Sequence, residues 1–354
     1  MNLEFLGYSN NIENYRSENG LGSFDVGRVI AEHKERYVVK TADKEYDAEI
    51  LGNLRYTAQS RLDFPAVGDW VAISEYDSDK GLIHAVFPRK SMITRKAVGK
   101  KGDKQIIATN IDKALIVQSV DRDFNINRIE RYLTICNESS VDPIIILSKI
   151  DLVEGALLPQ IIDSLQIRIN NVPVFTVSNE TLQGIEKLKA SIEKGLTYCF
   201  LGSSGVGKST LMNTIMGQQY MKTDTISYYS NRGRHVTTHR ELRVLANGGI
   251  FIDNPGMREV GITDAANGLE STFSTIAELS PKCKFKDCTH TTEVGCAVLA
   301  ALENDEIEKS SYQNYLKMVR EKDHFESTVA EKRKKDKDFG KMMKNYKKGN
   351  YKNH

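Results

Sequence analysis

The chain lacks two kinds of apolar segment. None of its apolar runs approaches the roughly 20 residues that a membrane-spanning helix needs. Its first 20 residues are polar and contain no hydrophobic core of the kind that a secretion signal requires. These absences argue against a membrane protein, and they predict a chain that is not secreted and works in the cytoplasm.

Cysteine is scarce and the net charge is small. Five cysteines in a chain with these cytoplasmic features point to free thiols or metal ligands rather than disulfides. The net charge of +2 hides an asymmetry, because residues 331–354 contain ten Lys or Arg and three Asp or Glu, a local charge of +7. Such a basic tail either is simply solvated or neutralises RNA phosphates.

The pattern of apolar residues changes along the chain. Short strand-like stretches between residues 21 and 96 predict a small barrel of the OB type. After a Gly- and Lys-rich linker, residues 97–105, buried strands alternate with amphipathic helices from 106 to 262, which predicts a mostly parallel α/β sheet. We expect residues 1–20 to be a mobile lead-in, 263–330 a zinc-binding helical module and 331–354 a basic tail. The expected barrel strands are Val26–Ile30, Arg36–Lys40, Tyr46–Leu51, Asp69–Ser74, Ile83–Phe87 and Ser91–Thr94.

Basic and aromatic residues of the barrel region predict a surface for RNA, since cations suit phosphates and aromatic rings stack on bases. The alternative is a solvated barrel surface with scattered charges. The residues in question are Arg55, Tyr56, Arg61, Arg89, Lys90, Arg95 and Lys96.

The strongest motif is a P-loop. A short apolar strand ending at Leu201 runs into Gly-x-x-x-x-Gly-Lys-Ser, and a helical pattern follows it. Glycines let the loop fold so that its N–H groups face phosphate oxygens; Lys208 then reaches the β- and γ-phosphates, and Ser209 offers its hydroxyl to Mg²⁺. The alternative is an ordinary Gly- and Ser-rich turn. The residues expected to bind nucleotide here are Gly202, Ser203, Ser204, Gly205, Val206, Gly207, Lys208, Ser209 and Thr210.

Two further strand ends carry groups suited to guanine. Ser148-Lys149-Ile150-Asp151 follows one apolar strand, and Ser178-Asn179 follows the next. A carboxylate only accepts hydrogen bonds, and guanine offers N1–H and its exocyclic amine as adjacent donors, which adenine does not. Asp151 therefore predicts selection of guanine, with the Lys149 stem across the base and a backbone N–H of the Ser178-Asn179 stretch toward the guanine carbonyl.

Residues beyond the P-loop predict a Mg²⁺ and γ-phosphate site. A loop rich in Ser, Thr and Arg contains His235, Thr237 and Thr238, and a hairpin then leads to Asp253-Asn254-Pro255-Gly256. A threonine hydroxyl, from Thr237 or alternatively Thr238, and the Asp253 carboxylate suit Mg²⁺, while the backbone of Gly256 suits the γ-phosphate.

A cluster near the C-terminus predicts a structural zinc site. Cys283, Cys288, His290 and Cys296 lie within fourteen residues, and these soft or borderline ligands suit tetrahedral Zn²⁺. The alternative is a small loop of free thiols. Cys136 and Cys199 lie in a predicted helix and strand, where we expect them to be core residues.

These motifs occur in the permuted order base recognition, P-loop, switch loop and Asp-x-Pro-Gly. With a barrel before them and a Cys/His cluster after them, the chain resembles the family of ribosome small-subunit-dependent GTPases called RsgA or YjeQ, over about residues 21 to 300. The resemblance implies a factor that hydrolyses GTP slowly alone, binds the small (30S) ribosomal subunit and its rRNA, acts late in that subunit's maturation and is stimulated by it. We expect a monomer with one structural Zn²⁺, and Mg²⁺ bound with GTP.

Two residues depart from the family pattern, and one catalytic residue is expected. Ser148 stands where an Asn is usual, which weakens one contact to the purine, and Asn179 stands where a small Ala is usual, which crowds the base. Met257 follows the Asp-x-Pro-Gly glycine and cannot orient water, so we expect His235 to do so. The alternative functions are an RNA-binding switch with incidental hydrolysis and an unrelated P-loop ATPase or kinase with a zinc module.

Overall fold

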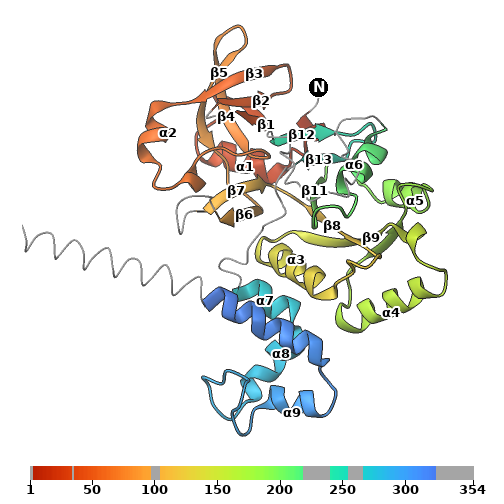
Figure 1. Ribbon diagram of the computed structural model, residues 1–354. Helices are drawn as coiled ribbons and strands as arrows, with labels where there is room; N and C mark the ends of the chain where they lie inside the picture. The colour runs from red at the N-terminus through yellow and green to blue at the C-terminus, as the bar shows by residue number, and fades with distance from the viewer. Residues whose placement is uncertain (1–2, 34–35, 97–103, 218–239, 254–265, 324–354) are drawn as a thin grey trace, which may run out of the picture. The chain divides into compact units, whose positions relative to one another are not determined.

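The computed structural model describes residues 3–33, 36–96, 104–217, 240–253 and 266–323 (Figure 1). The chain divides into two compact units, Met1–Arg95 with Lys104–Val260, and Lys96–Asp103 with Gly261–His354. The barrel and the P-loop region thus share one unit, and the finer domain boundaries stay a prediction. Among the described residues, no helix is both long and apolar enough to cross a membrane.

Five strands close the predicted barrel. They are β1 (Asp25–His33), β2 (Arg36–Lys40), β3 (Glu45–Ile50), β4 (Trp70–Asp77) and β5 (Lys80–Val86). The pairing runs β1-β2-β3-β5-β4, and β1 pairs with β4 to close the ring. Residues of β3 alternate between exposed and buried, as expected for strands with one face toward a core. Val29, Val39, Ile73 and Ile83 fill that core with no solvent exposure. Two short helices, α2 (Gly52–Thr57) and η2 (Arg61–Asp63), lie between β3 and β4.

The sixth predicted strand lies outside the barrel. It is β6 (Met92–Lys96), which pairs with β7 (Lys104–Thr109) as a separate two-stranded sheet. The last two residues of the predicted linker, Lys104 and Gln105, therefore belong to a strand, and residues 97–103 lie outside the described part of the chain.

The prediction of a mobile lead-in is wrong for most of residues 1–20. Leu3–Leu6 forms the short helix η1, and Asn10–Glu18 forms the helix α1. Leu6 is buried, the Tyr8 ring packs edge-on against Trp70, and Tyr15 packs against Phe87. A few well-spaced apolar side chains among many polar ones are enough to hold this segment on the barrel, which the overall polarity concealed.

The α/β region has the predicted strand and helix alternation. Its strands are β8 (Lys113–Ser119), β9 (Asp142–Ser148), β10 (Val174–Val177), β11 (Thr197–Leu201), β12 (Arg240–Val244) and β13 (Ile250–Asp253). The order β10-β9-β8-β11-β13 is parallel throughout, and β12 pairs antiparallel with β13 as the expected hairpin. The helices are α3 (Ile126–Glu138), η3 (Ile150–Leu152), α4 (Leu157–Arg168), α5 (Ile185–Ala190) and α6 (Lys208–Met216).

Helices cover both faces of this sheet (Figure 1). Ala114 and Ile116 of β8 pack in the cluster that contains residues of α3 and α4, whereas Leu115 and Val117 pack in the cluster of α5 and α6. The period of two along a fully buried strand is what a doubly covered sheet requires. Cys136 and Cys199 have no solvent exposure, which confirms them as core residues, and burial raises the pKa of the Cys199 thiol to about 12.

One feature of the sheet was not predicted. Strand β12 also pairs with β1 of the barrel, so the barrel and the α/β sheet form one sheet of eleven strands. The sequence places β1 and β12 more than 200 residues apart, and no local pattern indicates their pairing.

The second unit is small and helical. It contains α7 (Ala266–Thr272), α8 (Ser274–Leu279), η5 (Ser280–Lys282), α9 (Ala297–Glu303) and a further helix at residues 309–323. Its core includes Phe273, Ile276, Val298 and Met318, all nearly or fully buried. Residues 324–354, with the basic tail, lie outside the described part of the chain.

Candidate nucleotide site and metal centre

Glycines shape the loop between β11 and α6. Gly202 has φ +147° and a side chain there would come within 2.4 Å of the Val117 carbonyl oxygen, so the position needs glycine. Gly207, with φ +94°, precedes the first residue of α6 and its carbonyl accepts a hydrogen bond from the Leu211 N–H at 2.8 Å. The loop thus delivers the chain directly into a helix N-terminus, the geometry that binds phosphate.

Lys208 lies over this loop. Its ammonium donates hydrogen bonds to the carbonyl oxygens of Gly202, at 2.7 Å, and Ser203. These contacts hold the charge inside the curve of the loop. A triphosphate that entered there would meet a cation already in place.

Three side-chain hydrogen bonds connect the predicted base-recognition residues. The Ser148 hydroxyl is fully buried and donates to the Val206 carbonyl of the P-loop at 2.7 Å. The Asn179 amide lies 3.3 Å from the Gly207 carbonyl, to which it donates. The Ser178 hydroxyl donates to one Asp151 oxygen at 2.5 Å. Ser148 and Asn179, the two residues that differ from the family pattern, therefore contact the P-loop backbone. The base-recognition and phosphate-binding segments are joined by these hydrogen bonds.

The Ser178 hydroxyl also organises its own loop. It accepts hydrogen bonds from the backbone N–H groups of Glu180 and Thr181, at 3.2 and 3.1 Å. The Asp151 carboxylate, on an exposed residue, is thus held by a fully buried hydroxyl. A fixed carboxylate at the carboxyl end of the strands is the group that guanine selection needs.

Sequence reasoning missed the partner of Lys149. This residue has left-handed backbone geometry, with φ +60°, and its ammonium lies 3.0 Å from a carboxylate oxygen of Asp121. Burial works against the Asp121 charge, but hydrogen bonds from Lys149, the Asp123 N–H and Ser119 outweigh it and lower the pKa of Asp121. Its position just after β8 was the available signal, because ligand-binding residues of parallel sheets follow strand ends.

Asp253 is the last residue of β13, beside the P-loop strand. β11 and β13 are parallel neighbours, with Cys199 opposite Ile252, so Asp253 and the P-loop emerge at the same sheet edge. Burial raises the pKa of Asp253 to about 6; Glu241 also raises it and Arg243 lowers it. A half-buried carboxylate with so little compensating charge is chemically suited to a divalent cation. His235, Thr237, Thr238 and Gly256 lie outside the described residues.

The cysteine cluster is assembled as a metal centre. The ligand atoms of Cys283, Cys288, His290 and Cys296 all lie within 4.8 Å of one another. His290 Nδ1 is 3.4 Å from the Cys296 sulfur and 3.6 Å from that of Cys283, and these two sulfurs are 3.8 Å apart. Three thiols and one imidazole around a common point can hold one metal ion in tetrahedral geometry.

Surrounding groups orient these ligands. His290 Nε2 is 3.0 Å from the Ser280 hydroxyl, which leaves Nδ1 for the metal, and the Tyr312 hydroxyl donates to the His290 carbonyl at 2.6 Å. The Leu299 N–H donates to the Cys296 sulfur at 3.4 Å, at the start of α9. Such outer contacts are typical of a ligand set built for metal.

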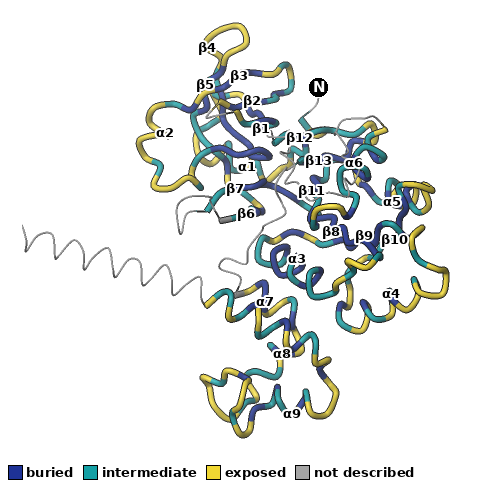
Figure 2. The backbone as a smooth tube through the Cα atoms, in the orientation of Figure 1, coloured by how far each residue is buried: buried dark blue, intermediate teal, exposed yellow. Residues whose placement is uncertain are grey.

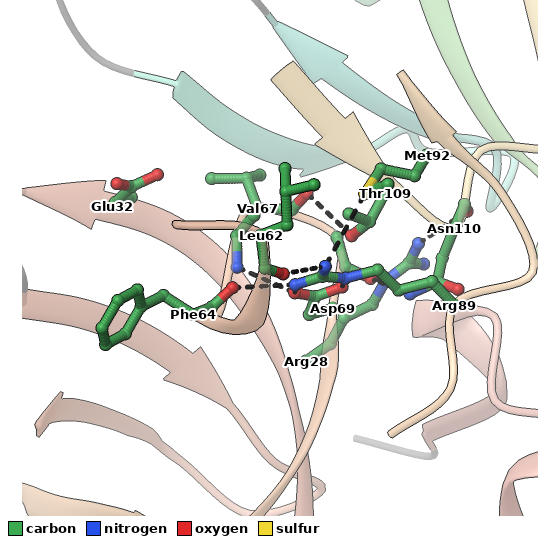
Figure 3. Close-up of polar contacts among 12 residues, drawn as sticks. Arg28, Glu32, Leu62, Phe64, Val67, Asp69, Arg89, Met92, Thr109 and Asn110 are labelled. Atoms are coloured by element: carbon green, nitrogen blue, oxygen red, sulfur yellow. Dashed lines mark hydrogen bonds and ion pairs between the residues drawn. The ribbon is translucent and has the colours of Figure 1, made fainter. Parts of the chain in front are cut away.

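Arg89, which the sequence placed on a basic RNA-binding surface, has a structural role instead. Its guanidinium bonds both oxygens of the fully buried Asp69, at 2.8 and 2.7 Å, and donates to the carbonyls of Leu62 and Phe64 (Figure 3). A bidentate pair this well satisfied fixes the loop before β4. Arg89 is therefore removed from the candidate RNA contacts.

Comparisons with known proteins agree with this geometry. A family model described as RsgA GTPase matches residues 86–263, and a model described as ABC transporter matches residues 185–354, which include the P-loop. A small ribosomal subunit biogenesis GTPase RsgA 1 of Bacteroides thetaiotaomicron is 38% identical over 98% of this chain and 97% of its own length. An RsgA 2 of Lactiplantibacillus plantarum is 44% identical over 84% of this chain and 83% of its own.

Solved structures give the same answer. The crystal structure of YjeQ from Thermotoga maritima is 26% identical, with a TM-score of 0.62, over 84% of this chain and 98% of that one. YloQ, described as a circularly permuted GTPase, shares the fold with a TM-score of 0.61 over 86% of this chain and 96% of that one, at 23% identity. The permuted motif order, the closed barrel and the extent of the identity lead to one conclusion: the chain belongs to the RsgA family of GTPases.

Proposed function

We propose that this protein hydrolyses GTP, binds the small (30S) ribosomal subunit late in its maturation, and is stimulated by that subunit. Family membership supports the GTPase activity, and the names of the relatives supply the link to small-subunit biogenesis. The observation that carries the choice of nucleotide is the Asp151 carboxylate, held by Ser178 beside the P-loop. Adenine offers no pair of donors to such an acceptor.

In this proposal the base and the phosphates bind to connected loops. Asp151 accepts from guanine, the Lys149 stem covers the base, and the backbone after Ser178 meets the guanine carbonyl. The P-loop N–H groups and Lys208 bind the β- and γ-phosphates, and Gly256 contacts the γ-phosphate. The full set is Ser148, Lys149, Ile150, Asp151, Ser178, Asn179, Gly202, Ser203, Ser204, Gly205, Val206, Gly207, Lys208, Ser209, Thr210 and Gly256.

Hydrolysis needs a positioned water and compensation of phosphate charge. Ser209, Asp253 and Thr237, with Thr238 as the alternative to Thr237, are the groups that would hold Mg²⁺, which neutralises phosphate charge. His235 is the proposed group that orients the water. Met257, which follows the Asp-x-Pro-Gly glycine, has no hydrogen-bonding group for this task.

We further propose that the metal of the second unit is zinc, one per chain. Three cysteines and one histidine form a ligand set that suits Zn²⁺ and contains no carboxylate, which Mg²⁺ or Ca²⁺ would require. All four positions are filled by protein, as in structural sites. The ion would then stabilise this unit and take no part in hydrolysis.

The proposed partner of the exposed barrel surface is RNA. The protein is proposed to act as a cytoplasmic monomer. Residues 52–63, which follow β3, are mostly exposed (Figure 2), and Tyr56 is 90% exposed beside Arg55. Aromatic faces and cations together suit unpaired bases and phosphates. The basic tail, with Lys332, Lys341 and Lys348 among its ten cations, would add phosphate contacts.

Single-turnover hydrolysis with and without purified small subunits tests this function. We expect slow hydrolysis alone, a large increase with subunits, and competition by GDP but not by ATP. Binding to subunits without stimulation would favour the alternative of a GTP-dependent RNA switch. Competition by ATP would overturn the guanine assignment and favour an unrelated P-loop ATPase or kinase.

A further inference from the structure

A single row of three residues joins the barrel to the nucleotide site. In β12, Glu241 lies opposite Ala31 of barrel strand β1 on one side and opposite Asp253 of β13 on the other. Neighbouring strands are about 4.8 Å apart, so Asp253 is only two strand spacings from the barrel. Paired strands thus form a continuous path from β1 to this edge of the site.

The next row contains an ion pair between the two parts. Glu32 of β1 lies opposite Arg240 of β12, and Arg240 Nη1 is 3.4 Å from Glu32 Oε2. The two side chains are 33% and 15% exposed, so solvent screens the pair only partly. Arg240 follows Thr238 by two residues in the chain, which makes it the first described residue after the proposed catalytic loop.

The same barrel strand also holds the strand that leads to the P-loop. Arg28 of β1 is fully buried, and its guanidinium donates to the Thr197 hydroxyl at 2.9 Å and to the Asn110 carbonyl at 3.2 Å. Thr197 is the first residue of β11. Strand β1, with Arg28 and Glu32 labelled in Figure 3, thus contacts the start of β11 and the start of β12.

We propose that β1 couples binding at the barrel to GTP hydrolysis, and that Glu32 is a positioning residue that acts through Arg240. The inference rests on the proposed function, because the ligand of the barrel is the RNA of the small subunit. RNA that shifts or stiffens β1 sets the position of Arg240 and, in the next row, of Glu241 and Asp253. Coupling of binding free energies is reciprocal, so if β1 also changes the affinity for GTP when the subunit binds, the bound nucleotide changes the affinity for the subunit by the same factor.

The experiment compares the wild type with Glu32→Gln, Arg240→Gln and the charge-swapped pair Glu32→Arg with Arg240→Glu. Two quantities are measured: the factor by which subunits stimulate hydrolysis, and the ratio of subunit affinities with a non-hydrolysable GTP analogue and with GDP. Cross-strand charge pairs of this kind are worth up to about a fivefold change in an equilibrium. We expect each single variant to lower both quantities about fivefold, and the swapped pair to restore most of the loss.

Glu45→Gln is the matched control. Glu45 of β3 pairs with Lys40 of β2 at 3.1 Å, so this exposed ion pair links two strands of the barrel only, and β3 itself pairs with β2 and β5. Its loss should leave stimulation and the affinity ratio unchanged, whereas a general weakening of the barrel would lower them in this variant too. Thermal unfolding of every variant identifies any that fails to fold, in which case Arg240→Lys, which keeps the charge, replaces it and should retain partial coupling.

The outcomes separate this inference from the proposed function. A wild type that subunits bind but do not stimulate would overturn the proposed function. A stimulated wild type whose Glu32→Gln variant keeps the same stimulation and the same affinity ratio would overturn only the coupling through β1. If the swapped pair loses as much stimulation and as much of the affinity ratio as the single variants do, charge complementarity between positions 32 and 240 does not carry the coupling.

Discussion

The two compact units are stabilised in different ways. In the α/β unit, two large apolar clusters cover both faces of the sheet, and polar side chains at the strand ends are left to build a site. The second unit has a small core. Its Cys283, Cys288 and His290 lie in segments that are neither helix nor strand. Small cores supply little net stability, so we expect a metal at the four-ligand cluster to supply stability that packing does not provide. On the proposed function, the same chain uses a polar cluster for recognition where the core is large and for folding where the core is small.

The largest effect is expected from loss of a metal ligand. Cys288→Ser should release the metal and unfold the second unit, because binding of a structural Zn²⁺ is coupled to folding and is worth on the order of 10 kcal/mol. GTP binding should change little. Elemental analysis and limited proteolysis report the two effects, and Asp287→Ser, an exposed non-ligand neighbour, is the control. Full folding of the metal-free wild type would contradict the comparison.

The second prediction concerns hydrolysis, for which we propose a catalytic group, His235, that is not part of the connected base-recognition and phosphate-binding loops. His235→Ala should reduce subunit-stimulated hydrolysis by about 10²- to 10⁴-fold, the range for removal of a group that assists proton transfer or positions water. Nucleotide and subunit binding should stay nearly unchanged. Lys208→Ala is the contrasting variant, since it removes a ground-state phosphate contact and should weaken GTP binding itself. Equal single-turnover rates for wild type and His235→Ala at saturating subunit would assign the water to another group.

The third prediction tests whether the α/β unit uses its polar cluster for recognition. Asp151→Asn replaces an acceptor by a side chain that also donates, so GTP should bind about 10²-fold more weakly, as expected for lost hydrogen bonds to a charged group. Xanthine nucleotides, whose C2 oxygen is an acceptor, should gain relative to GTP. Competition binding with GTP and XTP measures the change. Ser178→Ala should give a smaller loss of GTP affinity and no change in the preference for GTP over XTP, because it only releases the Asp151 carboxylate from its hydrogen bond.

Sequence alone predicted the barrel, the α/β alternation, the P-loop and the metal cluster, since each depends on a local period or spacing. It failed where distant residues decide the structure. The pairing of β1 with β12 joins strands with no shared pattern, and the role of Arg89 depends on Asp69, twenty residues earlier. The packed helix α1 was hidden because a few apolar residues sufficed. The contacts of Ser148 and Asn179 with the P-loop backbone were equally out of reach, because a backbone carbonyl has no signature in sequence.

The smallest effect, and the one that sharpens the comparison most, is the energetic penalty of the Asp253 carboxylate. Its pKa of about 6 in the folded protein lies above the ordinary value of 3.8, so the folded protein holds a proton more tightly than the unfolded chain. The stability contributed by this group is therefore present at low pH and is lost as the pH rises through 6. Asp253→Asn, which carries no charge, escapes that loss.

Nucleotide-free Asp253→Asn should accordingly be more stable than the wild type at pH 7.5, by about 1 to 3 kcal/mol from the shift between the two pKa values, and nearly equal to it at pH 4. Denaturant unfolding without added Mg²⁺ measures both differences. Asp163→Asn, at an exposed position on α4, makes the same chemical change without burial and should give no pH-dependent gain. A variant of Asp253 no more stable than the wild type at pH 7.5 would mean that the carboxylate is compensated in the folded protein. The sheet edge would then resemble the second unit, where polar ligands contribute to folding, rather than a site that sacrifices stability for function.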